Sequence, residues 1–354
     1  MLELRNVSKV VGAETHIDAV SLTLDRGSFN VLLGPTLSGK TSLMRLMAGL
    51  DRPTTGQVWF EGKDVTGMAV QKRNVAMVYQ QFINYPSMTV FENIASPLRV
   101  KGVDGTTIKA EVGKAAELLR LTPYLDRTPL SLSGGQQQRT AIARAVVKKA
   151  EVVLLDEPLA NLDYKLREEL RAELPKVFAE SGAIVVYATT EPMEALLLGG
   201  HTATLSQGRI TQFGPTIEVY RRPADLTTAR TFADPPLNTA QARKAGSHFL
   251  IGEGAGIAAP PGLVDGDYVI GVRAHHLTMA ASPGASRLAA TVYATEITGS
   301  ESYIHIDVAG SRWVMLAHGV HPFEAGQALE VFVEPRRLMV FDGAGVALQM
   351  GEAA

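Results

Sequence analysis

Leu132-Ser133-Gly134-Gly135-Gln136, continued as Gln137-Gln138-Arg139, runs directly into a helix that the sequence predicts over residues 136–149. Its two glycines let the backbone approach a phosphate closely, and the amides that open the helix point toward negative charge. Ser133 adds a hydroxyl donor to this turn. A polar turn that only caps the helix is the alternative interpretation. The motifs elsewhere in the chain favour a phosphate contact.

A second phosphate-binding pattern follows the apolar strand predicted over residues 29–33, which has the composition of a central parallel strand. Gly-x4-Gly-Lys-Thr after such a strand, with a helix behind it, is a Walker A loop. Its amides cradle phosphates, Lys40 neutralises the β and γ charges, and Thr41 is a ligand for Mg²⁺. The predicted nucleotide-binding residues of this loop are Gly34, Pro35, Thr36, Leu37, Ser38, Gly39, Lys40, Thr41 and Ser42.

A second all-apolar strand, residues 152–155, ends in Asp156 and Glu157. In a nucleotide site Asp156 would hold Mg²⁺ through water, and Glu157 would polarise the attacking water. Phosphoryl transfer depends mainly on positioning and charge neutralisation, so a carboxylate beside a phosphate loop suits this chemistry. An isolated Asp-Glu pair would ordinarily be interpreted as two acids at the surface end of a strand. The phosphate loop elsewhere in the chain makes that interpretation less favoured.

Composition restricts the class of protein. The chain has 354 residues and a formal net charge of -2, so no bulk basic field predicts a nucleic-acid partner. Cysteine is absent, which excludes disulfides and thiolate metal sites. The start of the chain alternates like a strand and predicts no signal peptide, and the longest apolar runs, such as residues 183–188, are too short to span a bilayer.

The chain is predicted to contain two domains, divided near Asp234-Pro235-Pro236. Residues 1–235 combine strands over 2–7, 18–24, 75–79 and 183–188 with helices over 90–100, 164–180 and 216–222, and residues 101–129 form a helical insertion. Residues 236–354 show short strands near 267–273, 289–297, 303–308, 312–316, 328–333 and 338–341, which suggests a small barrel. Residues 252–262 are predicted as a hairpin turn or loop. His275 and His276 are predicted on opposite faces of a strand, where they would not share a metal.

Taken together, these motifs resemble ATP-binding-cassette (ABC) ATPases, in the importer branch that serves sugars, polyols and glycerol phosphates. The runs at residues 85–94, 222–225 and 236–238 are similar to that branch, as is Gly271-Val272-Arg273-Ala274-His275-His276-Leu277. The resemblance implies an α/β P-loop ABC ATPase domain with a RecA-like core, an antiparallel β subdomain and a helical subdomain at about 85–150. An all-β, oligonucleotide-binding-like (OB-like, TOBE/MOP-type) regulatory domain would follow.

The resemblance also implies roles for single residues. The signature Leu132, Ser133, Gly134, Gly135 and Gln136 would contact the ATP held by a partner subunit. Gln80 corresponds to the Q-loop glutamine, which ligates Mg²⁺ with Thr41 and Asp156 and senses the membrane subunits; by itself, a glutamine at a strand end would be an ordinary surface residue. The catalytic residues would be Glu157, Gln80 and, in place of the family's switch histidine, Thr190. Asp163 would lie in the D-loop at the dimer interface.

The implied assembly contains ATP, Mg²⁺, a second ATPase subunit, two transmembrane permeases and an extracytoplasmic solute-binding protein. The chain would lie peripherally on the cytoplasmic face of the bacterial inner membrane. The permease and the binding protein choose the substrate in this family, so the sequence predicts a sugar, polyol, glycerol or glycerol phosphate without choosing among them.

Three positions depart from the family's pattern, and all belong to the site that this chain builds for its own nucleotide. Thr190 stands in place of the switch histidine, Val11 replaces the aromatic residue that stacks on adenine, and Leu37-Ser38 replaces a Gly-Cys pair. His16 or another nearby group would compensate for Val11. The hypothesis is an asymmetric pair in which this subunit has a weakened site and donates an intact signature. A symmetric homodimer that tolerates Thr190 is the alternative.

Other functions compete with that of a transport ATPase. A subunit that binds nucleotide with little hydrolysis of its own is favoured by Thr190 and Val11 and opposed by Glu157. A soluble phosphate-loop kinase or GTPase has no use for residues 132–136. A non-transport ABC ATPase of DNA repair or translation would carry a coiled-coil insertion or a duplicated cassette, and the sequence shows neither.

Overall fold

The computed structural model describes residues 1–81, 83–179, 181–252 and 255–349. The contacts divide the chain into two compact units, Met1–Thr216 and Ile217–Ala354. This division lies earlier than the proline-rich stretch at 234–236 suggests, because α8 (Leu226–Thr231) and all but the first residue of α7 (Thr216–Arg221) belong to the second unit. The buried guanidinium of Arg273 donates to the carbonyls of Tyr220 and Phe232, and Leu226 packs beside Met339 and Phe341.

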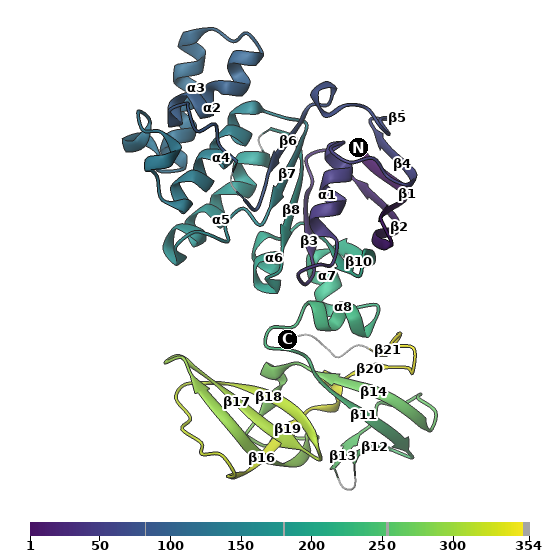
Figure 1. Ribbon diagram of the computed structural model, residues 1–354. Coiled ribbons are helices and arrows are strands. Elements are labelled where there is room, and N and C mark those ends of the chain that lie inside the picture. The colour runs from purple at the N-terminus through teal and green to yellow at the C-terminus, as the bar shows by residue number, and fades with distance from the viewer. Residues whose placement is uncertain (82, 180, 253–254, 350–354) are drawn as a thin grey trace. The chain divides into compact units, whose positions relative to one another are not determined.

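The first unit is built on a six-stranded sheet in the order β10-β9-β3-β8-β7-β6 (Figure 1). Strands β3 (Phe29–Leu33), β6 (Val75–Val78), β7 (Val152–Asp156), β8 (Ile184–Thr189) and β9 (His201–Ser206) are parallel, and β10 (Arg209–Pro215) is antiparallel to β9. The carboxyl ends of the parallel strands therefore share one edge of the sheet. The loops that leave β3, β6, β7 and β8 there carry the phosphate loop, Gln80, Glu157 and Thr190 respectively.

A second sheet of the first unit is antiparallel, in the order β2-β1-β4-β5. It contains β1 (Leu2–Val11), β2 (Glu14–Leu24), β4 (Thr55–Phe60) and β5 (Lys63–Asp64). Alternate side chains of β1, including Leu2 and Leu4, pack in one core with Leu43 and Met44 of α1 (Lys40–Ala48). Helix α1, which follows the phosphate loop, is thereby fixed between the two sheets.

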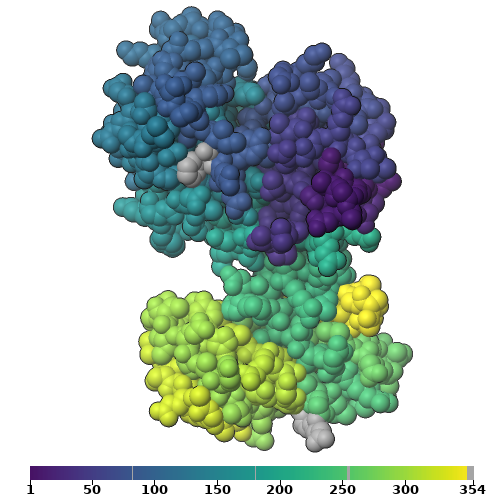
Figure 2. All heavy atoms as spheres, viewed as in Figure 1, coloured from purple at the N-terminus to yellow at the C-terminus, as the bar shows by residue number. Residues whose placement is uncertain are grey.

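A helical segment follows β6 and forms the blue lobe at the upper left of the first unit (Figure 2). It contains α2 (Val90–Val100), α3 (Gly105–Leu118) and α4 (Gly134–Lys148), which begin at the caps Thr89, Asp104 and Ser133. Helices α5 (Tyr164–Ala179) and α6 (Pro192–Leu198) return the chain to the sheet. The predicted end of α5 at residue 180 lies outside the described residues. Among the helices that the structure describes, none is long and apolar enough to cross a membrane.

The strands of the second unit form two antiparallel sheets around one shared core, where the sequence suggested a small barrel. One sheet has the order β13-β12-β11-β14-β20-β21 and the other has the order β15-β19-β16-β17-β18. Their bounds are β11 (Asn238–Ala245), β12 (His248–Ile251), β13 (Ala255–Ala258), β14 (Gly266–Val272), β15 (Leu277–Thr278), β16 (Ser286–Ile297), β17 (Glu301–Val308), β18 (Ser311–His318), β19 (Ala328–Val333), β20 (Met339–Phe341) and β21 (Ala347–Gln349).

Two details of this unit differ from the sequence prediction. Residues 252–262 contain strand β13, which pairs antiparallel with β12. The predicted hairpin is therefore present, and the prediction of a turn or loop was wrong only where β13 runs. His275 and His276 lie in a 3₁₀ turn, Ala274–His276, and their ring centroids are 4.4 Å apart. The prediction of opposite strand faces failed because the strand ends at Val272.

Candidate nucleotide site

A cavity of about 630 Å³ opens at the carboxyl edge of the central sheet. The phosphate loop, the start of β2 and the turn between β9 and β10 surround it. The lining residues are Glu14, Thr15, His16, Thr36, Leu37, Ser38, Gly39, Lys40, Thr41, Ser42, Gln80, Glu157, Gln207 and Gly208. Most of the predicted nucleotide-binding residues therefore share one cavity with two predicted catalytic residues, Gln80 and Glu157.

The phosphate loop encloses the ammonium group of Lys40. Lys40 Nζ donates to the carbonyls of Gly34 over 2.8 Å and Pro35 over 3.1 Å. Burial lowers the pKa of Lys40, while Glu157 and Asp156 oppose that shift. A Cβ atom on Gly34 would lie 2.5 Å from the carbonyl oxygen of Leu205, so glycine is required at this turn. The amides at the start of α1 and this cation give the cavity the donors that a polyphosphate needs.

The loop also holds one buried hydroxyl without a partner. Ser38 Oγ has no hydrogen-bond partner among the described residues, although the side chain is buried. Buried polar atoms in folded proteins are normally paired, so an unpaired one at a phosphate loop fits a ligand that brings an acceptor. The neighbouring Leu37 has a left-handed backbone, φ 67°, and a side chain that is 96 % exposed.

Candidate oxygen ligands for a divalent cation lie at the ends of β6 and β7 and at the start of α1. Thr41 Oγ1 donates to Asp156 Oδ2 over 2.7 Å, and Gln80 Nε2 donates to Glu157 Oε2 over 3.0 Å. The amide oxygen of Gln80 is then directed away from Glu157. A hydroxyl, a carboxylate and an amide oxygen are the hard donors that Mg²⁺ prefers, so this set fits the ion. Burial raises the pKa of both Asp156 and Glu157, and Lys40 opposes both shifts.

The signature stretch begins helix α4. Ser133 Oγ accepts from the amide of Gln136 over 3.4 Å, and Gln136 Oε1 accepts from the amide of Ser133 over 3.0 Å. This reciprocal pair is a capping box. A Cβ atom on Gly135 would lie 3.3 Å from the carbonyl oxygen of Asn161, so this glycine lets α4 approach residues 159–163 closely. Ser133 and Gly134 remain exposed at the helix start.

Val11, Thr190 and Asp163 lie outside the lining of the cavity, as do Gly34, Pro35, Asp156 and the signature residues 132–136. Val11 is 50 % exposed at the end of β1 and is not among the lining residues, whereas His16 is. Thr190 is exposed and directly follows β8. Asp163 is exposed and caps α5 through a hydrogen bond from the amide of Leu166, over 3.0 Å.

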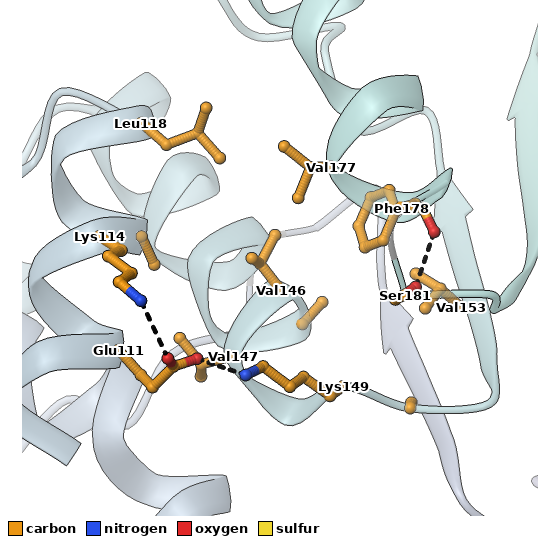
Figure 3. A pocket seen from close by; sticks show the side chains of 13 residues that line it. Glu111, Lys114, Leu118, Val146, Val147, Lys149, Val153, Val177, Phe178 and Ser181 are labelled. Atoms are coloured by element: carbon orange, nitrogen blue, oxygen red, sulfur yellow. Dashed lines mark hydrogen bonds and ion pairs between the residues drawn. The ribbon is translucent and has the colours of Figure 1, made fainter. Parts of the chain in front are cut away.

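A second hollow, of about 460 Å³, lies where α3, α4 and α5 approach one another (Figure 3). Its floor is apolar and includes Leu118, Val146 and Phe178. Glu111 lies between two lysines at its rim, 3.5 Å from Lys114 and 2.6 Å from Lys149. Both lysines that line this hollow are thus paired with a carboxylate. The cavity at the phosphate loop remains the candidate nucleotide site.

Comparison with known proteins agrees with this geometry. Residues 17–160 match the family described as ABC transporter, and residues 270–341 match the TOBE domain. The sn-glycerol-3-phosphate import ATP-binding protein UgpC of Chromobacterium violaceum is 37 % identical over 349 residues, which cover 96 % of this chain and 94 % of that protein. This chain belongs to the ABC importer ATPases.

Other members of the ABC family show the same relationship. The trehalose/maltose import ATP-binding protein MalK of Thermococcus litoralis is 35 % identical and is matched over 96 % of this chain and 97 % of its own length. A dimeric ATP-binding cassette, solved in a post-hydrolysis state with ADP and Pi, has a TM-score of 0.56 and 29 % identity. It covers 61 % of this chain and 99 % of its own length, so an ABC ATPase fold with a C-terminal all-β TOBE domain describes the chain.

Sequence reasoning missed some groups that support the ABC site. Gln138, buried in α4, donates through Nε2 to the carbonyl of Glu157 over 3.3 Å and so ties the signature helix to the catalytic loop. Glu194, also buried, accepts hydrogen bonds from Tyr187 and Thr189 at the end of β8. A glutamine within a polar helix start gives no distinctive signal. Glu194 is an acidic residue at a helical position between apolar neighbours, which indicates a buried carboxylate.

Proposed function

We propose that this protein hydrolyses ATP to drive the import of a sugar, polyol, glycerol or glycerol phosphate. The observation that carries the proposal is the environment of Glu157, which lies 3.8 Å from Lys40 Nζ and accepts a hydrogen bond from Gln80. A carboxylate fixed between a phosphate-binding cation and an amide donor is placed to act on a water near the terminal phosphate. The substrate class rests on the named relatives, which import glycerol phosphate, trehalose or maltose.

Each residue then has a chemical task. Lys40 and the amides that open α1 hold the polyphosphate and neutralise its charge. Thr41, Asp156 and Gln80 would hold Mg²⁺, which supplies further positive charge to the phosphates when it is bound. Glu157 orients and polarises the attacking water. Burial raises the pKa of this carboxyl, and nearby Lys40 opposes the rise. Thr190 supplies one hydrogen bond where the family has a histidine.

The proposed partners are a second ATPase subunit and two transmembrane permeases, with an extracytoplasmic solute-binding protein attached through the permeases. A groove of about 670 Å³ between η1 (Val70–Lys72), α2 and α4 fits a short cytoplasmic helix of a permease. Its lining joins Tyr85, Pro97 and Val100 with the cations Lys72, Arg73, Lys101, Arg144 and Lys148. This arrangement would hold the chain on the cytoplasmic face of the bacterial inner membrane.

The three departures from the family pattern support an asymmetric pair. Thr190 cannot carry the positive charge of a histidine, Val11 offers no ring to the base, and Leu37 places a side chain where the family has glycine. Each departure weakens the site that this chain builds, while residues 132–136 stay intact for the partner's nucleotide. In a homodimer, the two sites would instead be equal, and Glu157 would act with Thr190 in both.

Affinity purification of the tagged chain from gently solubilised membranes of its own host tests the assembly. A second ATPase chain with histidine at the position of Thr190, recovered with two permeases, supports the asymmetric pair, and the co-purifying binding protein identifies the substrate. Recovery of this chain as the sole ATPase overturns asymmetry. If the site of this chain is weakened, Thr190→His should raise the rate of coupled ATP hydrolysis in the purified complex. An unchanged rate would contradict a weakened site.

A subunit that binds ATP without hydrolysing it is the second candidate, and Thr190 favours it. Trapping with a non-hydrolysable ATP analogue measures binding, and release of phosphate from ATP in the same complex measures turnover. Trapping without turnover at this chain's site would replace the hydrolytic proposal with the regulatory one.

A further inference from the structure

One arginine of α5 contacts two loops of the ATP site that are far apart in sequence. Arg167 Nη2 donates to the carbonyl of Ala160 over 3.2 Å, and Arg167 Nη1 lies 3.2 Å from Glu191 Oε1. Ala160 belongs to residues 159–163, which carry the predicted D-loop. Glu191 directly follows Thr190. We call Ala160, Arg167 and Glu191 together the Arg167 bridge.

The turn that carries Thr190 is fixed on its inner side by a buried network. Thr189 Oγ1 donates to Glu194 Oε2 over 2.7 Å and accepts from the amide of Glu191 over 3.0 Å. Tyr187 donates to the same oxygen of Glu194 over 3.2 Å. These three side chains are buried, so the inner side of the turn is rigid. On the outer side, the turn is held through the half-exposed carboxylate of Glu191.

The bridge itself has capacity for one more hydrogen bond. Arg167 Nε is buried and has no acceptor among the described residues. A buried donor without an acceptor carries a free-energy cost, which is relieved when an acceptor approaches. A guanidinium offers its donors in a fixed plane, so a displacement of either loop changes the geometry of the contact to the other. This geometry makes Arg167 responsive to movement at residues 159–163.

We propose that Arg167 is a positioning residue that couples residues 159–163 to the turn at 189–191. Docking of the second ATPase on residues 159–163 would then set the place of Thr190 relative to the nucleotide. In this proposal, Arg167 acts on the turn through Ala160 and Glu191. The proposal rests on the proposed function, which assigns residues 159–163 to the dimer interface and Thr190 to the ATP site.

Hydrogen exchange of the full-length chain tests the coupling without requiring hydrolysis. The amides of Ala160 and Leu162 are hydrogen-bonded, so their exchange reports opening of residues 159–163. Glu191→Gln weakens the bridge from its far end and should speed exchange in residues 159–163 severalfold. In an Arg167→Met background, the same substitution should add nothing. An unchanged rate after Glu191→Gln, or an equal effect in both backgrounds, overturns the proposal.

Arg171→Met is the matched control. Arg171 lies one turn further along α5 and pairs with Glu168 of the same helix. The substitution removes the same side chain from the same helix without touching either loop, so exchange in residues 159–163 should stay as in the wild type. If Arg171→Met speeds that exchange as much as Arg167→Met does, the effect is a general loosening of α5 and the bridge has no special role.

Hydrolysis by the assembled transporter gives a second readout. Arg167→Met should lower kcat about tenfold and leave the KM for ATP within about twofold, because a coupling residue acts on the place of Thr190 and not on nucleotide binding. Arg167→Lys keeps the charge toward Glu191 but lacks the planar set of donors of a guanidinium. Its kcat should lie between those of the wild type and Arg167→Met. A rise in KM with unchanged kcat overturns the proposal. A wild-type complex that does not hydrolyse ATP refutes the proposed function, while the exchange cycle still decides the bridge.

Discussion

Gln80 Nε2 lies 3.0 Å from Glu157 Oε2, so the loop after β6 and the loop after β7 meet at one carboxylate. Lys40 Nζ approaches the other oxygen of the same carboxylate, Oε1, at 3.8 Å. Glu157 also has a left-handed backbone, φ 46°, which is uncommon for a residue other than glycine. Strained backbone is maintained in folded proteins chiefly where the surroundings fix it, and functional sites are the usual place. These contacts make Glu157 the first residue to test.

Glu157→Gln should lower ATP hydrolysis by about 10²- to 10⁴-fold while ATP binding is retained, because the amide keeps the shape and loses the base. Phosphate release and equilibrium binding of a fluorescent ATP analogue measure the two effects. Glu151→Gln is the control, since Glu151 immediately precedes β7 and pairs with Arg26 at the opposite end of the strand. A Glu157→Gln protein that keeps more than a tenth of the wild-type rate would remove Glu157 from the chemistry.

Leu37→Gly should stabilise the protein by about 1 kcal/mol, because a left-handed backbone costs a residue with a Cβ roughly 1–2 kcal/mol. The leucine side chain is 96 % exposed, so its removal costs little burial. Denaturant unfolding of the first unit measures the change. Leu130→Gly, at an exposed leucine in a 3₁₀ turn, should instead destabilise. If both substitutions lower the free energy of unfolding, the left-handed backbone at position 37 carries no cost.

His16→Ala should weaken ATP binding at least about fivefold, whereas Val11→Ala should change it less than twofold. His16 lines the cavity and Val11 does not, and loss of a stacked ring costs about 1–3 kcal/mol by analogy with base–aromatic contacts. The carbonyl of His16 lies close to Gly39 and Gly208, so its position beside the phosphate loop is fixed. Titration with labelled ATP distinguishes the variants. A larger loss of affinity in Val11→Ala than in His16→Ala would mean that Val11, and not His16, contacts the adenine base.

Glu194→Gln should alter the pH dependence of stability. Burial raises the pKa of Glu194 above the ordinary 4.5, although the hydrogen bonds from Thr189 and Tyr187 oppose the shift. The unfolded chain then releases this proton at a lower pH than the folded chain does. The free energy of unfolding therefore falls as the pH rises from about 4.5 through the folded-state pKa.

The amide of Glu194→Gln cannot ionise, so its stability relative to the wild type should increase over the same pH range. Urea unfolding of both proteins at several pH values between 4 and 7 measures the difference. A difference that stays constant across this range would mean that Glu194 ionises equally in the folded and unfolded chains.

The sequence predicted the central strands well and the second unit less well. Phe29–Leu33 and Val152–Asp156 are almost wholly apolar because both faces of the sheet are covered, and such runs are visible without a structure. Strand β11 was missed because its buried positions alternate through small and polar residues, including Asn238, Ala240 and Ala242. Helix α8 is one short polar segment, which the sequence does not distinguish from a loop.

The site divides in a similar way. Lys40, Thr41 and Glu157 were predicted from local motifs, and the structure brings them to one cavity because their loops leave the same edge of a parallel sheet. The contact between Arg167 and Glu191 depends on how a helix packs beside a turn. A single arginine and a single glutamate on polar segments give no signal of such a contact. Sequence motifs therefore predict functional residues that are close together in the chain. They do not predict the supporting contacts that form only when distant segments pack together.

The capping box at Ser133 and Gln136 has a consequence for how this chain can evolve. The oxygen of Ser133 accepts a hydrogen bond from its own helix, and this bond does not use the hydroxyl proton, which a phosphate would accept. Loss of such a cap costs about 1 kcal/mol of stability. Selection for a folded helix α4 is therefore sufficient to retain both residues, even in a lineage whose partner site no longer uses them. An inactive descendant of this subunit would still display an intact signature.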